Sequence, residues 1–276
     1  MKKIAFIGSG VMGTAMGTAA CRGIDPQQVV VTDSDQEKAK SLAQALGCCY
    51  APSNEEAVQE CRYIMFCIKP QVLYPVLQDL APVFKSCRHR GEEKIIVSIV
   101  AGVESKTYIE AMGLEDYHVP VIRMQPNTAC VIGKSYTVVL DDDGYSQEQL
   151  SQLLEILRET GKFEKVAPAQ YIPAMVLTTI SPAFASMFAS ALADGGVVNG
   201  LFRPQARRHA LEGVLSALQL MLESEKHLDQ FKDEVCSPAG PGIYGVKSLE
   251  DSGFRGSLIR AVGSCCDRFK EIGKIG

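Results

Sequence analysis

Several features that would assign a function at once are missing from this 276-residue chain. No run of Lys or Arg is longer than two residues, and 28 basic against 32 acidic residues give a net charge of −4. Such a chain carries no basic patch for nucleic acid or for an anionic membrane. Its four histidines suggest neither a Ser-His-Asp arrangement nor a metal cluster. We therefore expect a small-molecule ligand, with no nucleic acid, no membrane partner and no metal.

The ten cysteines form no Cys-x-x-Cys pair. Adjacent cysteines, as at Cys48–Cys49 and Cys265–Cys266, are poor metal chelates and poor disulfide partners. Cys67 lies in an apolar run, where a cysteine behaves as a small buried hydrophobic residue. This pattern is typical of a reducing compartment, and we expect the protein to be cytoplasmic.

Long hydrophobic runs are also lacking. No window approaches eighteen apolar residues, so we expect no membrane span. The start of the chain superficially imitates a signal peptide, but its apolar run is short and is broken at once by Gly8, Gly10 and Gly13.

Hydrophobic residues make up 46% of the chain and charged residues 22%, as in an ordinary globular protein of one large or two smaller domains. Six apolar runs, rich in β-branched residues and continuous rather than alternating, are typical of buried parallel strands: residues 4–7, 29–31, 64–68, 95–100, 119–122 and 136–140. Amphipathic segments such as residues 35–46 lie between them. A further helix is expected at 146–160, capped by Ser146 and stopped by Gly161. Residues 1–166 are therefore predicted to form a Rossmann-like, doubly wound α/β sheet.

Strand signals vanish after residue 166, and helical patterns replace them at 173–193, 204–223 and 257–272. Pro204 suits a first-turn position and Ser257 an N-cap. A segment this apolar needs more partner surface than its own helices offer, so residues 167–276 are predicted to be an all-helical oligomerisation domain. The alternative is a helical cap folded onto its own sheet.

A glycine-rich motif follows the first predicted strand and opens a helix, comprising Gly8, Ser9, Gly10, Val11, Met12 and Gly13. In this context the first glycine allows a tight turn, the second lets backbone N–H groups approach a pyrophosphate, and the third permits close helix packing. The helix N-terminus then completes an anion site. A βα corner without a ligand is the alternative interpretation.

Asp33 ends the second predicted strand, twenty residues beyond Gly13. A carboxylate there accepts hydrogen bonds from an adenosine ribose and repels a 2′-phosphate, which favours NADH over NADPH. Ser34 and Lys38 are nearby donors that weaken this preference, and Asp33 could instead cap the following helix.

Several separated motifs together resemble those of the pyrroline-5-carboxylate reductases, in family order over nearly the whole chain. Beyond the glycine-rich loop they are Asn54 and residues 67–71, 98–103, 123–128, 191–197, 237–240 and 253–255. The resemblance implies reduction of 1-pyrroline-5-carboxylate to L-proline by hydride from NAD(P)H. It also implies a homodimer interleaved through its carboxy-terminal helices, sometimes assembled further.

The chemistry that this resemblance implies needs positioning more than acid-base catalysis, because a protonated imine is already electrophilic. The candidate catalytic residues are Lys69 and Asn127, expected at carboxyl ends of strands, and Ser237. Candidate cofactor contacts beyond the glycine-rich loop and Asp33 are Asn54, Ile68, Lys69, Pro70 and Ala101. Candidate substrate contacts are Ser181, Pro182, Ala239, Gly240, Pro241 and Gly242.

The segment 237–242 precedes a predicted helix at 243–249, whose free N–H groups could hold a substrate carboxylate. A plain interhelical turn is the alternative for this segment, and Lys69 could be a solvated loop charge.

Two departures from the family pattern put the substrate in question. Residues 178–181, Thr-Thr-Ile-Ser, replace a Ser-Gly-Ser-Gly run, and Gly242 replaces a Thr whose hydroxyl contacts the substrate nitrogen. A related imine or small-acid reductase is therefore one alternative function. A cofactor-binding homologue without turnover is another.

Overall fold

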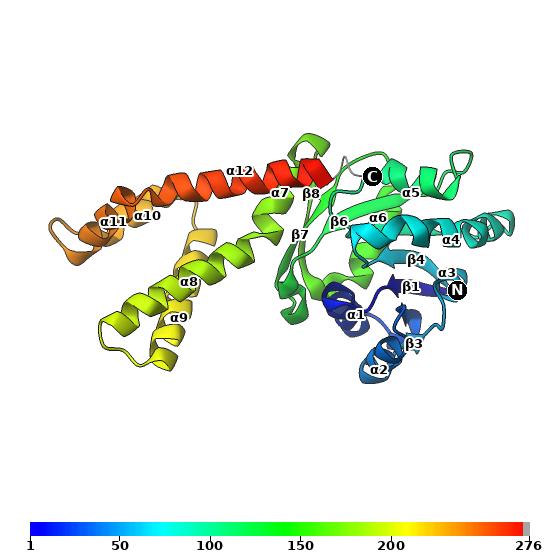
Figure 1. The fold of residues 1–276 in the computed structure, drawn as a ribbon, viewed down its shortest axis with the longest axis horizontal. Helices are drawn as coiled ribbons and strands as arrows, with labels where there is room; N and C mark the ends of the chain where they lie inside the picture. Colours follow the sequence, from blue (N-terminus) through cyan, green and yellow to red (C-terminus); the bar gives the residue numbers. More distant parts are fainter. Residues whose placement is uncertain (273–276) are drawn as a thin grey trace. The chain divides into compact units, whose positions relative to one another are not determined.

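The computed structural model describes residues 1–272, and its amino-terminal part is built on one eight-stranded sheet (Figure 1). The strand order is β3-β2-β1-β4-β5-β6-β7-β8. The strands are β1 Lys2–Ile7, β2 Val29–Thr32, β3 Cys49–Tyr50, β4 Cys61–Phe66, β5 Ile95–Ser98, β6 Val121–Gln125, β7 Ser135–Leu140 and β8 Gly161–Val166. This doubly wound α/β sheet confirms the predicted fold class, and all six predicted strands are present.

Three details of the sheet differ from the prediction. β7 runs antiparallel to β6, whereas every other neighbouring pair is parallel. β3 and β8 had not been predicted: β3 has two residues, and β8 is an edge strand in which Lys162, Glu164 and Lys165 are exposed. The predicted helix 146–160 ends at Ile156, and Gly161 begins β8 rather than only stopping a helix.

Helices cover both faces of this sheet because successive residues of a buried strand point to opposite sides. Ala5 and Ile7 of β1 pack with the helices α3 Asn54–Glu60, α4 Pro70–His89 and α5 Ser105–Met112. Ile4 and Phe6 pack with α1 Val11–Gly23, α2 Gln36–Leu46 and α6 Gln147–Ile156. Both faces are thus buried, as the continuous apolar runs predicted.

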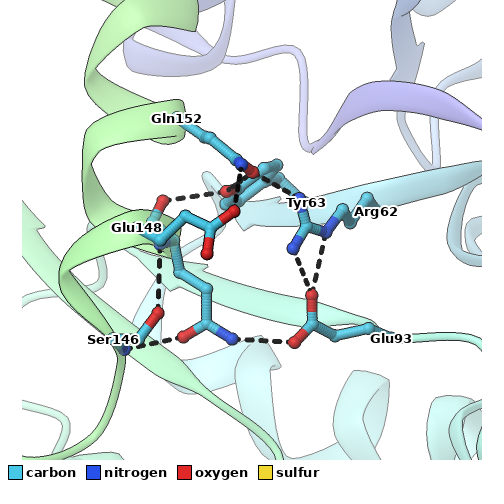
Figure 2. Close-up of polar contacts among 7 residues, drawn as sticks. Arg62, Tyr63, Glu93, Ser146, Glu148 and Gln152 are labelled. Carbon is cyan, nitrogen blue, oxygen red and sulfur yellow. Dashed lines mark hydrogen bonds and ion pairs between the residues drawn. The ribbon is translucent and has the colours of Figure 1, made fainter.

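A polar network fastens α6 to the amino ends of β4 and β5 (Figure 2). Arg62 Nε donates to Glu93 Oε2 at 2.9 Å, and its Nη1 donates to Gln152. Gln149 Nε2 donates to the other oxygen of Glu93 at 2.8 Å, while the Tyr63 hydroxyl donates to the Gln149 carbonyl. Burial opposes ionisation of Glu93, but the hydrogen bonds from Arg62 and Gln149 outweigh it and lower the pKa of that carboxyl. The network therefore stabilises the ionised form of Glu93 in the folded protein.

Within residues 1–272 six helices follow the sheet, at α7 Pro168–Thr179, α8 Ser181–Val198, α9 Arg203–Leu222, α10 Leu228–Val235, α11 Pro241–Asp251 and α12 Phe254–Ile272. The predicted helix 173–193 is thus two helices that meet at Ile180. Pro204 lies in the first turn of α9 as predicted. Ser257 is not an N-cap: it lies inside α12, where its hydroxyl donates to the Gly253 carbonyl.

The chain forms two compact units, which divide after Thr179 rather than at residue 166, where the strands end. The first is Met1–Thr179 together with the segment from Cys265 onward, and the second is Ile180–Ser264. α7 belongs to the first unit because Tyr171 and Met175 pack against Val138 and Leu140 of β7.

Together α7 and α8, Pro168–Val198, are long and apolar enough to cross a membrane by length and composition alone. The expectation that no window approaches this length is wrong, because no charged residue interrupts the chain between Pro168 and Ala193. A single stretch of this kind is weak evidence for a span.

Candidate functional site

The glycine-rich loop lies at the carboxyl end of β1, where the strand order reverses between β1 and β4. Open α/β sheets bind ligands in the crevice at such a reversal. Gly8 has φ +101°, and a Cβ there would lie 2.8 Å from the Cys67 carbonyl oxygen, just beyond β4. Position 8 therefore requires glycine for both its backbone angle and its approach to the next strand.

The other two glycines of the loop have different surroundings. A Cβ on Gly13 would lie only 1.9 Å from the Gly8 carbonyl oxygen, so α1 packs directly on the loop. Around Gly10, the N-cap of α1, no atom lies within 4 Å of a Cβ position. No side chain of the described residues caps α1 either, so its first N–H groups have no side-chain partner. The loop therefore offers backbone donors to an anion such as a pyrophosphate.

Asp33 is tied to this loop as well as to the next helix. Its Oδ2 accepts the Ser9 N–H at 2.6 Å, and its Oδ1 accepts the Asp35 N–H at 3.0 Å. Burial alone would raise the pKa of Asp33, but these two hydrogen bonds, with Lys38 Nζ 3.9 Å away, lower it. Asp35, not Asp33, is the N-cap of α2. Asp33 is therefore an ionised group fixed beside the glycine-rich loop.

The remaining candidate cofactor residues follow neighbouring strands of the same unit. Asn54 opens α3 beyond β3, with Ser53 as its N-cap. Ile68, Lys69 and Pro70 connect β4 to α4, with Lys69 as N-cap and Pro70 in the first turn. Ala101 lies between β5 and α5. The parallel strands thus bring these residues to the same edge of the sheet as the glycine-rich loop.

Asn127 follows β6, and its side chain is engaged by its own unit. Its Oδ1 accepts the Ala129 N–H at 2.9 Å, capping the 3₁₀ turn Thr128–Ile132. Its Nδ2 donates to the Thr178 carbonyl at 2.8 Å. That carbonyl belongs to the last turn of α7, which has no intrahelical partner for it. Asn127 therefore joins the carboxyl edge of the sheet to the end of α7.

The candidate substrate residues lie in the second unit, at the N-termini of two helices. Gly240 is the N-cap of α11, and Pro241 is in its first turn. Ala239 has φ +55°, an uncommon angle for a residue with a side chain. A Cβ on Gly240 would lie 2.3 Å from Ser237 Oγ, so that hydroxyl lies directly against the turn. The segment is a tight turn that opens a helix, as predicted.

Ser181 and Pro182 occupy the first turn of α8, after Ile180 as N-cap. Where the family run has Ser and Gly, Thr178 and Thr179 donate their hydroxyls back to carbonyls within α7, at 3.1 Å to Ala174 and 2.7 Å to Met175. The residues that replace the family run thus end α7 with both threonine hydroxyls hydrogen-bonded to the helix backbone.

Thr14 also supports the site, although it had not been predicted. Its hydroxyl donates to the Ser9 carbonyl at 3.1 Å and so holds the glycine-rich loop from the first turn of α1. A Thr directly after the third glycine was the available signal, since Thr hydroxyls commonly bond to nearby backbone.

Comparison with known proteins agrees with this arrangement. Residues 169–272 match the family model described as pyrroline-5-carboxylate reductase dimerisation, and residues 3–102 match the one described as NADP oxidoreductase coenzyme F420-dependent. The pyrroline-5-carboxylate reductase of Escherichia coli K12 is 31% identical over 99% of this chain and 99% of its own length. That of Methanosarcina acetivorans is 34% identical over 99% of this chain and 98% of its own.

A solved structure gives the same result for the fold. Pyrroline carboxylate reductase from Plasmodium falciparum, with NADP bound, has a TM-score of 0.85 at 23% identity, covering 99% of this chain and 98% of its own. With full-length relatives above 30% identity, the chain belongs to the pyrroline-5-carboxylate reductase family.

Proposed function

We propose that this protein reduces 1-pyrroline-5-carboxylate to L-proline by hydride transfer from NAD(P)H. The observation that carries the proposal is the glycine-rich loop at the reversal of strand order, with Gly8 and Gly13 packed too tightly for any side chain. This geometry occurs in a chain related over its full length to pyrroline-5-carboxylate reductases.

The dinucleotide fits the residues that are present. The space around Gly10 and the uncapped start of α1 would receive the pyrophosphate. Asp33 and Asn54 would lie toward the adenosine half, and Ile68, Pro70 and Ala101 toward the nicotinamide half. When bound, the reduced nicotinamide supplies the hydride.

We further propose that NADH binds more tightly than NADPH. The Asp33 carboxylate is ionised and fixed by Ser9 and Asp35, so it cannot turn away from a 2′-phosphate without losing two hydrogen bonds. The same carboxylate is free to accept a hydrogen bond from a ribose hydroxyl with its remaining lone pairs. Lys38, 3.9 Å away, offsets part of the repulsion.

The substrate carboxylate is assigned to the turn at Ser237 and the first N–H groups of α11. Ser237 offers a hydroxyl, and the N–H of Gly242 lies in the first turn, where helix N–H groups have no intrahelical partner. Helix N-termini bind carboxylates for this reason. Gly242, however, has no hydroxyl to meet the substrate nitrogen.

Reduction then requires alignment rather than proton transfer by a side chain. Hydride addition forms a C–H bond at the imine carbon, and the π electrons of the protonated C=N bond become the amine lone pair. Asn127 acts as a positioning residue, since its side chain holds the 3₁₀ turn and the end of α7. Lys69, the N-cap of α4, would contribute positive charge at the same edge of the sheet.

We also propose that the chain assembles as a homodimer or a higher homo-oligomer. In Ile180–Ser264 the buried apolar side chains are Ala193, Ala206 and Phe231, too few for a stable core. Large apolar residues of α8 and α9 are exposed instead, including Met187, Leu192, Leu211, Leu215, Leu218, Leu220 and Leu222. A partner subunit would cover such a surface. Because all ten cysteines are free, we place this assembly in the reducing cytoplasm.

The test is to follow the absorbance of NADH and NADPH separately after adding 1-pyrroline-5-carboxylate to the full-length protein. Oxidation that depends on the imine supports the proposal. A related imine or small-acid reductase is the second candidate, favoured by Gly242 in place of Thr. Oxidation with another cyclic imine but not with 1-pyrroline-5-carboxylate would establish that second function. Cofactor binding without oxidation of either cofactor would indicate a non-catalytic homologue.

A further inference from the structure

A cavity of about 570 Å³ lies within the first unit, and no residue of the glycine-rich loop lines it. It is bounded by the start of α5, by β6 and the end of β7, by α7, and by Phe269 and Lys270 of α12. None of the dinucleotide or substrate residues assigned above lines it. The function proposed above therefore leaves this cavity unexplained.

Two hydroxyl groups in its wall are buried without a partner. Among the residues that the structure describes, neither Ser105 Oγ nor the Tyr171 hydroxyl makes a hydrogen bond. Tyr171 is 4% exposed, and burial raises its pKa more than the neighbouring Arg123 and Gln125 lower it, so its hydroxyl stays protonated and can donate. Folded proteins rarely leave such groups unpaired, since each unmet hydroxyl costs about 1–3 kcal/mol. Both hydroxyls are therefore available to a polar ligand.

Arg123 adds a positive charge to the same wall. It lies in the middle of β6, half-buried, with its guanidinium 5.2 Å from the centre of the Tyr171 ring. Within residues 1–272 its side chain makes no ion pair and no hydrogen bond, unlike Arg62, which binds Glu93. A guanidinium held in a strand with five unused donors is suited to a carboxylate or a phosphate.

The other charges of the cavity do not satisfy Arg123. Glu104 pairs with Lys106 at 3.0 Å, and Asp142 accepts the Gly144 N–H at 3.0 Å. Lys270 also lines the cavity and pairs with Asp267 at 3.5 Å. Among the lining cations, Arg123 alone therefore has no acidic partner within residues 1–272, which favours an anionic ligand.

The remaining wall is apolar and limits the kind of anion. Leu140, Ile172, Met175 and Phe269 line it. A free phosphate would leave these side chains uncovered, whereas an apolar body attached to the anionic group would cover them.

We propose that this cavity binds a small carboxylic acid with an apolar body, whose carboxylate pairs with Arg123 and accepts hydrogen bonds from Ser105 and Tyr171. The ligand would contact Ser105 at the start of α5, next to the loop that carries Ala101. This site goes beyond the proposed reductase function, whose substrate loop lies in the other unit.

Benzoate is a suitable probe, with neutral benzamide as the matched control. Calorimetric titration of the full-length protein, saturated with NADH to occupy the dinucleotide site, should show one benzoate per chain with a Kd of about 1 mM or tighter. Benzamide should bind at least about tenfold more weakly, because it lacks the charge that Arg123 recognises.

Variants identify the site. Arg123→Met keeps the apolar stem and should weaken benzoate binding at least about tenfold, while Arg88→Met, an exposed arginine of α4, should not. Tyr171→Phe should weaken binding about fivefold without lowering the Tm, because it removes a hydroxyl that has no partner. If Arg123→Met fails to fold, benzoate binding by Tyr171→Phe tests the site on its own. Ser237→Ala should bind benzoate as the unmutated protein does.

The proposal is overturned if the unmutated protein shows no saturable benzoate binding, or if both pocket variants, when folded, bind as tightly as it does. Equal loss of binding in Ser237→Ala would also overturn it, because the carboxylate would then lie at the substrate loop. Turnover of 1-pyrroline-5-carboxylate is measured separately, so a failed reductase assay leaves this result interpretable.

Discussion

Restoring the missing hydroxyl at residue 242 is the sharpest test of the substrate assignment. Gly242 lies inside α11 and is not among the glycines with positive φ, so a side chain meets no backbone strain there. A Cβ would lie 3.2 Å from the Val235 carbonyl oxygen and 3.5 Å from Cys236 Sγ. The first distance is shorter than an ordinary van der Waals contact, so the Val235 carbonyl must move by a few tenths of an ångström. Gly242→Thr is therefore expected to fold.

The expected gain follows from one hydrogen bond. A hydrogen bond contributes about 1 kcal/mol, and up to about 3 kcal/mol when one partner is charged, as the protonated imine is. These values correspond to about 5-fold and about 150-fold in kcat/KM for 1-pyrroline-5-carboxylate. Threonine is also slightly better than glycine within a helix, so the Tm should not fall.

Gly242→Val is the matched control, because valine has nearly the shape of threonine without the hydroxyl. Steady-state kinetics should show a gain for Gly242→Thr and none for Gly242→Val. An equal gain in both variants would mean that rigidity of the turn, not the hydroxyl, matters. If Gly242→Thr folds and leaves kcat/KM unchanged, proline formation is not the native reaction and the related imine reductase becomes the leading function.

Three further predictions concern the cofactor, the assembly and the fold. Asp33→Asn removes the charge beside the 2′-position but keeps a side-chain acceptor. Fluorescence titration should show the affinity for NADPH, relative to that for NADH, rising by about 5- to 30-fold. Tighter binding of NADPH than of NADH by the unmutated protein would contradict this prediction. Leu218→Asp places a charge on the exposed apolar face of α9, and light scattering should find a smaller assembly; a full-length unmutated chain that is already monomeric at micromolar concentration would contradict the prediction. Glu93→Gln should lower the free energy of unfolding by about 0.5–1 kcal/mol at neutral pH, discounted because Glu93 is 42% exposed. The folded-state pKa of Glu93 is lowered, so its contribution to the free energy of unfolding is present above the ordinary carboxyl pKa and is lost as the pH falls through the folded value. Urea unfolding should therefore show the difference in stability between the unmutated protein and Glu93→Gln closing below about pH 4. A difference that does not depend on pH would exclude the ion pair as its source.

The sequence predicted those parts of the fold that local pattern determines. The apolar runs of β1, β2, β4 and β5 are buried on both faces, so their composition alone identified them. Gly8 and Gly13 were assigned correctly because a backbone angle and a close packing contact each require glycine there. The N-cap at Ser146 was found for a similar reason, as Gln149 completes a capping box with it.

Features that depend on contacts between residues far apart in the chain could not be predicted from the sequence. β8 is a half-polar edge strand whose assignment rests on its pairing with β7, and the antiparallel direction of β7 has no local signal. The break between α7 and α8 at Ile180 interrupts a run that is helical by composition throughout. The cavity at Arg123 brings together residues from five elements, and only the presence of an arginine inside an apolar strand hinted at it.

Proline formation by hydride transfer is tested most directly by locating the transferred hydrogen in the product. The full-length protein is incubated with 1-pyrroline-5-carboxylate and with NADH or NADPH that carries deuterium on the reactive nicotinamide carbon, and the product is examined by mass spectrometry and NMR. We expect L-proline with one deuterium on the ring carbon that is bonded to nitrogen and does not carry the carboxylate, when the cofactor stereoisomer competent for transfer is used. Oxidation of the cofactor without labelled proline from either stereoisomer, or proline no more abundant than in a protein-free control, would contradict it.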